Sequence, residues 1–417
     1  MNLPALSITV PRVPVGDGFK AGVDFLKDNL AWLFDIIGTI IEVCVEFLGV
    51  TLSEPSATQL FVAASVVVAV GLWLRGHRYS ATIPFAVWIA VWAAEAYGGA
   101  TTAMLSQLDP VLFTWAQSLF GEEARFVYPQ LLPAIPLFLA LAVLSFTMTR
   151  DPRQRRLAIY VICGLAAFIA LHFIVGVQLS LLVTMLFVLV AWLIAGTGLA
   201  IFSLLGFLLI ISMGLFDDAM STLALIIVAT AVAVAIALPL GVLAAYNDRV
   251  SNVLKPVLDF MQTLPAFVYL LPAISFFSVG EVPGVIATVI FAMPPGVRLT
   301  ELGIRQVDKE LVEAGEAFGA PDSQILRNIQ LPLALSTIMA GINQVIMLSL
   351  SMVVIAGMVG ASGLGNQVYT GIAQAQIPIG FEGGIGVVIL AIYLDRLTGA
   401  VTRFSPAAKA QRAAASR

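Results

Sequence analysis

Long apolar runs recur along the chain, separated by short polar segments. A bilayer core about 30 Å thick requires ~20 mostly apolar residues in a helix. The runs lack the ten-residue alternation of transmembrane barrel strands, so helices are expected. The pattern predicts eleven spans, at residues 59–75, 81–97, 131–148, 157–175, 178–195, 198–215, 222–246, 264–280, 282–298, 336–360 and 381–400.

Composition supports a membrane protein. Of the 417 residues, 60% are hydrophobic and only 11% are charged, whereas soluble domains carry about 25% charged residues. This excludes a water-soluble enzyme, a nucleic-acid binder and a disordered scaffold, and makes the lipid bilayer the expected solvent. Cys44 and Cys163 lie far apart, so neither a disulfide framework nor a metal-ligand spacing is indicated.

Basic residues predict the orientation. With the C-terminus in the cytoplasm, seventeen of the 21 Lys and Arg residues fall in internal segments, and the other four are Arg12, Lys20, Lys27 and Arg125. The positive-inside rule predicts such an asymmetry. We therefore expect an external N-terminus and a cytoplasmic C-terminus. The first residues lack a basic-then-apolar signal pattern and are expected to stay on the mature protein.

Residues 21–50 are apolar but carry an acidic stripe, and they are expected to lie at the membrane surface. The acids are spaced 4, 7, 7 and 4 residues apart and fall within about 40° of one another on a helix. A narrow acidic face on an apolar helix suits the interface or a protein groove. The stripe consists of Asp24, Asp28, Asp35, Glu42 and Glu46.

Catalytic and metal chemistry is not indicated. No GxxxxGK[ST] phosphate loop occurs, and no His, Cys, Asp and Glu cluster has metal-ligand spacing. No span carries the chain of acids and bases typical of a proton-coupled carrier, although sodium sites built from carbonyls would escape this criterion. The glycine-rich stretch Gly360–Gly365 follows an apolar helix, not a strand, and predicts a sharp turn at a helix end.

Residues 303–335 form the longest internal loop and have a helical pattern. Leu311, Ala314, Gly315 and Phe318 form one helix face, with charged residues opposite. Asp308 is suited to the N-cap, and Gly319 to the left-handed residue that ends the helix before Pro321. A second short helix is expected from Ser323 to Ile329. From the helical pattern alone, this loop could either dock onto a partner or lie on the lipid surface.

The spacing of this loop resembles the EAA loop of permease subunits of ATP-binding-cassette (ABC) importers. Glu313-Ala-Gly315, Gly319 and Ile329-x-Leu331-Pro332 carry the likeness. The wider segment, about 217–400, resembles the glycine betaine/proline betaine branch. The supporting segments are Asp217–Leu225, Ile236–Val242, Leu258–Pro272, Phe291–Pro295, Ala340–Gln344 and Leu390–Leu397.

The resemblance implies a fold and a set of partners. The expected architecture is an all-α polytopic membrane protein with a type I ABC importer core, about eleven transmembrane helices and an external amphipathic N-terminal helix. Four regions are expected: the external region 1–58, helices in 59–215 that include additional spans at about 81–175, the permease domain 217–400, and the cytoplasmic tail 401–417.

As a transport subunit of the bacterial inner membrane, such a chain is not an enzyme and needs no cofactor or metal. Its implied partners are cytoplasmic ATPase subunits, an external substrate-binding protein and a second permease copy in a homodimer. The implied ATPase-coupling residues are Glu313, Ala314, Gly315, Phe318, Gly319, Ile329, Leu331 and Pro332. The sequence departs from the branch at Asp308, where proline is common, and at Gly315, where alanine is common.

The implied cargo is glycine betaine, proline betaine or a related quaternary amine. Asn343 or Gln344, Met347 and Ser351 form a stripe on one span that could line its path, and Tyr269 could offer a cation–π contact. Helix–helix packing is the alternative role for each. Two other functions stay open: an ion-coupled transporter or channel acting without an ATPase, and a membrane sensor or scaffold.

Overall fold

The computed structural model describes residues 15–55, 63, 66, 67, 70 and 179–401, and its regular elements are all helical. The predicted spans 81–97, 131–148 and 157–175, nearly all of 59–75, and the tail from residue 402 lie outside this part. The helices are α1 (Val15–Ser53), α9 (Leu179–Ile194), α10 (Thr197–Ser212), α11 (Phe216–Tyr246), α12 (Asp248–Thr263), α13 (Ala266–Phe277), α14 (Glu281–Arg305), α15 (Lys309–Ala317), α16 (Asp322–Ile325), the π-helical turn η2 (Leu326–Gln330), α17 (Leu331–Ser351), α18 (Val353–Met358), α19 (Leu364–Ala373) and α20 (Ile377–Val401).

Within the described residues, four helical stretches are long and apolar enough to cross a bilayer: Phe216–Tyr246, Glu281–Arg305, Asp322–Met358 and Ile377–Ala400. The predicted spans 222–246, 282–298, 336–360 and 381–400 lie mainly within these stretches. The predicted spans 178–195 and 198–215 correspond to the shorter apolar helices α9 and α10. The total of eleven spans stays a prediction.

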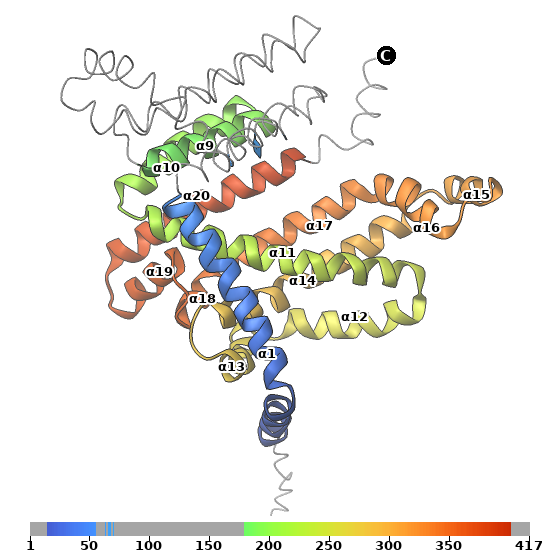
Figure 1. The fold of residues 1–417 in the computed structure, drawn as a ribbon, viewed down its shortest axis with the longest axis horizontal. Coiled ribbons are helices and arrows are strands. Elements are labelled where there is room, and N and C mark those ends of the chain that lie inside the picture. The colour runs from blue at the N-terminus through green and yellow to red at the C-terminus, as the bar shows by residue number, and fades with distance from the viewer. Residues whose placement is uncertain (1–14, 56–62, 64–65, 68–69, 71–178, 402–417) are drawn as a thin grey trace, which may run out of the picture.

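Small residues allow close helix crossings at the centre of the bundle, where α14 packs between α11 and α17 (Figure 1). A β-carbon on Gly241 of α11 would lie 2.5 Å from Cβ of Thr300 in α14. A β-carbon on Gly341 of α17 would lie 3.0 Å from Cβ of Leu299. Close approach through small residues is a common basis of helix packing in membranes.

A second packing group joins α20 to α9 and α10. The rings of Phe187 and Phe207 stack with centroids 4.8 Å apart, and Tyr393 of α20 meets both rings edge-on. The buried Tyr393 hydroxyl donates to the carbonyl oxygen of Phe187 at 3.2 Å. The hydroxyl thus has a partner in an otherwise apolar cluster.

The span predicted at 264–280 is the second arm of a bent helix pair. Helices α12 and α13 meet at 98°, and Pro265 occupies the N-cap of α13 with an extended backbone. Proline fixes its own φ and disfavours helix in the residue before it, which accounts for the break. The sequence pattern placed residues 248–263 in a loop, whereas they form a helix. Pro294 and Pro295 are buried inside the continuous α14.

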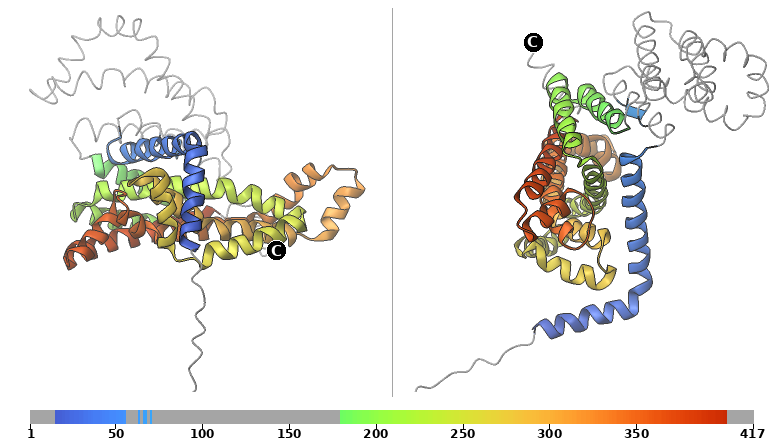
Figure 2. Two further views of the ribbon diagram at one scale, coloured as in Figure 1. Left: turned by 90° about the horizontal axis from the view of Figure 1, so that it is seen from below. Right: turned by 90° about the vertical axis from the view of Figure 1, so that its left-hand side faces the viewer.

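Figure 2 shows that the first part of α1 points away from the bundle and that, after a kink, the rest of the helix runs along the side of the bundle. Leu30 has non-helical angles at the kink (φ −123°, ψ 19°). Beyond it, Ile41 and Val45 are buried against α11 and α14, and Phe34 stacks on Phe276 of α13 at 4.2 Å. The five acidic residues of the predicted stripe are all exposed.

A glycine turn, Val359–Gly365, connects α18 and α19. Gly360 and Gly363 have positive φ values of 89° and 103°, as the sequence predicted for a turn at a helix end. The amide of Leu364 donates to Thr222 Oγ1 of α11 at 2.8 Å, and the amide of Gly280 donates to the carbonyl oxygen of Val359 at 2.9 Å. The turn is therefore tied to α11 and to the start of α14.

Candidate functional site

The predicted loop between α14 and α17 projects beyond the bundle as two helical arms, seen at the right of Figure 1. Its first arm is α15, and Asp308 caps it by accepting the amide of Glu310 at 3.1 Å. Gly319 has a φ of 75° and ends the arm, as predicted. The amide of Ala320 then donates to the carbonyl oxygen of Gly315 at 3.1 Å. We call Phe318–Pro321 the elbow.

Gly315 lies inside the loop, between its two arms. A β-carbon there would lie 2.9 Å from Cδ1 of Ile329 and 3.3 Å from Cγ1 of Ile325. Ile325 is buried and Ile329 is half-buried. The absence of a side chain at Gly315 therefore allows the second arm to pack against the first, and fixes the angle between them.

The outer surface of α15 is open. Phe318 is 92% exposed and Leu311 is 46% exposed, and Glu313 and Ala314 are also exposed. An aromatic ring this exposed contributes little to the stability of the folded chain. The exposed set provides an apolar knob flanked by carboxylates.

The second arm continues into α17 without a break. The sequence pattern ended this arm before Leu331-Pro332, but η2 joins α16 to α17 as one stretch, Asp322–Met358. Pro332 lacks the N–H that an α-helix would use, and the π turn just before it takes up the altered hydrogen bonding. Leu331 and Pro332 are half-buried at the base of the loop, where Leu331 packs against the cluster of Ile304, Ala334 and Ile338.

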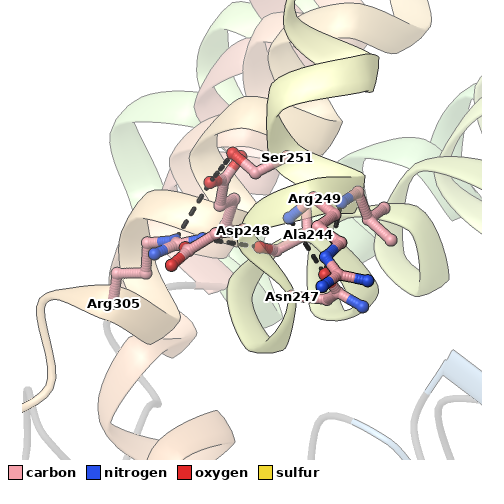
Figure 3. A network of polar contacts seen from close by, with 8 residues as sticks. Ala244, Asn247, Asp248, Arg249, Ser251 and Arg305 are labelled. Carbon is pink, nitrogen blue, oxygen red and sulfur yellow. Dashed lines mark hydrogen bonds and ion pairs between the residues drawn. The ribbon is translucent and has the colours of Figure 1, made fainter.

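A polar network braces the helix from which the loop departs (Figure 3). Arg305, at the end of α14, donates to the carbonyl oxygen of Ala244 at 2.7 Å and to Asp248 at 2.8 Å. Its Nε lies 3.0 Å from Glu301, and Ser251 donates to the same carboxylate oxygen at 2.7 Å.

This network joins α11, α12 and α14 next to the projecting loop. In the sequence, this network was indicated by the spacing of Glu301 and Arg305, which lie four residues apart on a helix. Its partners on α12 could not be read from the sequence, because residues 248–263 lacked a predicted helix. A further ion pair, Arg298–Asp259 at 2.5 Å, fixes α12 to α14.

Tyr269 is a packing residue in this structure. It is buried at the bend between α12 and α13, and its hydroxyl donates to the carbonyl oxygen of Met261. The ring packs within the cluster that contains Leu270 and Met352. This arrangement favours the packing role that the sequence left open.

Asn343 links two spanning helices. Its Nδ2 donates to Asp395 Oδ1 of α20 at 2.8 Å, and its Oδ1 lies 2.5 Å from the hydroxyl of Thr398, which can donate to it. Both ends of the amide are thus engaged. The Asn343 side chain is oriented toward α20.

Gln344, Met347 and Ser351 of α17 are all exposed in the single chain. Ser351 donates to the carbonyl oxygen of Leu348 at 2.7 Å, within its own helix. The sequence stripe therefore divides into Asn343, which connects two helices, and three residues that remain free to face a path or another subunit. Within the described residues, no group of three or more His, Cys, Asp and Glu side chains could hold a metal ion.

Residues 237–404 match the protein family described as "Binding-protein-dependent transport system inner membrane component". The match covers the last turns of α11, the helices α12 to α14, the projecting loop and the helices α17 to α20. It defines the class of protein as a multi-pass permease component of the inner membrane.

Two similar permeases show to which family within this class the chain belongs. The glycine betaine transport system permease protein OpuAB of Bacillus subtilis (strain 168) is 52% identical over 236 residues, covering 56% of this chain and 84% of OpuAB. The glycine betaine/proline betaine transport system permease protein ProW of Salmonella typhimurium is 51% identical over 220 residues, covering 53% of this chain and 62% of ProW. The chain belongs to the glycine betaine/proline betaine permease family of ABC importers.

A solved structure of the MetNI methionine ABC transporter in an inward-facing conformation is 23% identical, with a TM-score of 0.42 over 45% of this chain and 94% of that chain.

Proposed function

We propose that this chain is the membrane-spanning subunit of an ATP-driven importer for glycine betaine, proline betaine or a related quaternary-amine compatible solute. The observation that supports this cargo most strongly is the 52% identity to OpuAB over 84% of that relative. The chain itself is a transport subunit, and ATP hydrolysis takes place in separate cytoplasmic subunits.

In this proposal, residues 308–332 couple the permease to the ATPase. Phe318, Leu311, Ala314 and Glu313 form the surface that enters the ATPase groove. Gly315 and Ile329 set the angle of the two arms, and Gly319 makes the elbow. Closure of the ATPase pair moves the loop and shifts the permease between two rigid-body states.

A second copy of the chain and an external binding protein complete the proposed importer. The exposed face of Gln344, Met347 and Ser351 supports a path formed between two permease copies, because a polar stripe facing lipid would be unfavourable. The C-terminus is cytoplasmic and the N-terminus external.

Solute uptake tests the cargo. Cells lacking the chain are expected to lose high-affinity uptake of labelled glycine betaine or a related solute, and uptake is expected to rise with external osmolarity when the chain is restored. The matched control for coupling is the same cells supplied with the Gly319→Val chain, present in the membrane at normal abundance. Unchanged uptake of every such solute, with loss of a different one, would reject the cargo and leave the permease class intact.

Cysteine labelling tests the orientation. In a chain with Cys44 and Cys163 replaced by serine, Ser405→Cys should react with an impermeant reagent only from the cytoplasmic side, and Ser7→Cys only from the outside. Labelling of both positions from one face would rule out an odd number of spans.

A further inference from the structure

A groove opens between the turn that joins α9 to α10 and the last turns of α20. Its volume is ≈ 320 Å³, near the lower end of the ~300–1,000 Å³ typical of small-molecule sites. Ala195, Gly198, Leu199 and Phe202 line it on one side. Ile392 and Arg396 of α20 line the other, so an apolar groove contains one cationic group.

Arg396 has a free positive charge at this position. Its side chain is exposed, and within the described part of the chain it takes part in no ion pair. It forms no ion pair with the adjacent carboxylate, since Asp395 instead accepts the amide of Asn343 on α17 at 2.8 Å. The groove therefore presents a guanidinium with its donors available.

The surroundings of the groove face outward and are apolar. On α20, Val388 and Ile392 precede Arg396 at four-residue intervals and are 55% and 39% exposed. On α10, Ile201 and Leu205 are likewise exposed. Figure 1 shows the C-terminal end of α20 directed toward the side from which α15 and α16 project. An arginine thus ends an apolar surface stripe on a spanning helix, where a bilayer changes from acyl chains to headgroups.

We propose that this groove binds an anionic phospholipid. The guanidinium of Arg396 holds the phosphate through charge-assisted hydrogen bonds, and the acyl chains lie along Phe202, Ile392 and the exposed face of α10. Basic pockets between spanning helices bind lipid headgroups by this chemistry. The cationic arginine disfavours a quaternary amine here, so the groove is separate from the proposed transport path.

Lipid titration of the purified full chain, with its copurifying subunits and after removal of native lipid, tests the proposal. Native mass spectrometry would count bound phosphatidylglycerol and phosphatidylcholine. We expect the wild type to prefer phosphatidylglycerol, and Arg396→Gln to weaken that binding roughly tenfold by loss of a charged hydrogen-bond donor. Arg249→Gln, which removes an exposed arginine outside the groove, should bind as the wild type does.

A second variant fills the groove and keeps the charge. No atom lies within 4 Å of a β-carbon placed on Gly198, so Gly198→Phe can occupy the groove without a backbone clash. It should reduce phosphatidylglycerol binding, whereas Gly198→Ala should not. Thermal unfolding of each variant identifies a misfolded chain, and either variant alone can decide the outcome.

Three results would overturn the proposal. The first is equal phosphatidylglycerol binding by the wild type and by either variant, Arg396→Gln or Gly198→Phe, when that variant is correctly folded. The second is equal binding of phosphatidylglycerol and phosphatidylcholine by the wild type. The third is displacement of phosphatidylglycerol by millimolar inorganic phosphate, which would identify a site for the free anion.

Discussion

The glycine turn and the elbow both depend on glycine with positive φ, but their surroundings differ. A β-carbon on Gly363 would lie 2.4 Å from Thr222 Oγ1 and one on Gly365 would lie 2.1 Å from the carbonyl oxygen of Val353, whereas at Gly319 nothing lies within 4 Å. The glycine turn needs the missing side chains for space, and at Gly363 also for conformation. The elbow needs glycine for conformation alone. The first is fixed to the bundle, and the second leaves its arm free to meet a partner.

The largest expected effect is that of Gly365→Ala. The added methyl would overlap a backbone oxygen that cannot turn aside, and overpacking of this kind costs about 3 kcal/mol. Membrane abundance and the unfolding temperature of the purified chain should both fall. The matched control is Gly384→Ala in α20, where a β-carbon meets nothing. Because alanine has the higher helix propensity, this variant should be more stable than the wild type by about 0.5–1 kcal/mol. Equal stability of the two variants would contradict a close-packed turn.

Thr222→Val should be next in size. It leaves the amide of Leu364 without its acceptor, and an unsatisfied buried donor costs about 1–3 kcal/mol. Thr288→Val is the control, since that buried hydroxyl only donates to the carbonyl oxygen of Gly284 in its own helix. The two unfolding temperatures should differ by several degrees, and coincident values would mean that the hydrogen bond does not hold the turn to α11.

Gly319→Val should have a smaller effect on stability and a large one on coupling. A β-branched residue at positive φ costs about 1–2 kcal/mol, and the arms can respond by changing their angle. We expect normal membrane abundance, weak ATPase copurification and no substrate-stimulated ATP hydrolysis. Gly319→Asn, which tolerates this conformation, should retain coupling. Wild-type transport by Gly319→Val would favour the alternative in which residues 308–330 lie on the lipid.

Phe318→Ala should have the smallest effect on stability, within about 0.5 kcal/mol, because the ring is almost fully exposed. It should nevertheless weaken ATPase copurification, since the proposed knob is removed. Phe25→Ala, which removes an exposed ring from α1, should change neither property. Normal copurification of Phe318→Ala would exclude the ring as the docking element.

Local signals predicted the parts of the site that depend on neighbours in sequence. Asp308 and Gly319 were identified as helix ends because capping and positive φ are determined within a few residues. The inward position of Gly315, the bond from Asn343 to Asp395 and the bonds from Arg305 to Ala244 and Asp248 depend on contacts between separate helices. Spacing rules within one helix could not predict them.

The same distinction explains the fold. Apolar runs identified α11, α14, α17 and α20 with approximate bounds, and the family resemblance supplied the architecture. Helix α12 was missed because its alternating apolar and charged residues are typical of either a surface helix or a loop. The packing of α1 against the bundle was not predicted, since its acidic stripe dominated the sequence pattern.

The second arm of the loop continues into α17 as one helical stretch, which can move as a rigid lever. Residues Asp322–Met358 form one stretch of 37 residues, which at 1.5 Å per residue is about 55 Å long. We take Gly341, one of the close contacts of α17 with α14, as the pivot; it lies roughly 29 Å from Asp322 at the same rise. A tilt of about 10° about that point would move the tip of the loop by ~5 Å, with an opposite swing at the far end. In the proposed importer, a small movement of the ATPase on one side of the membrane would thereby be transmitted mechanically to the glycine turn on the other side.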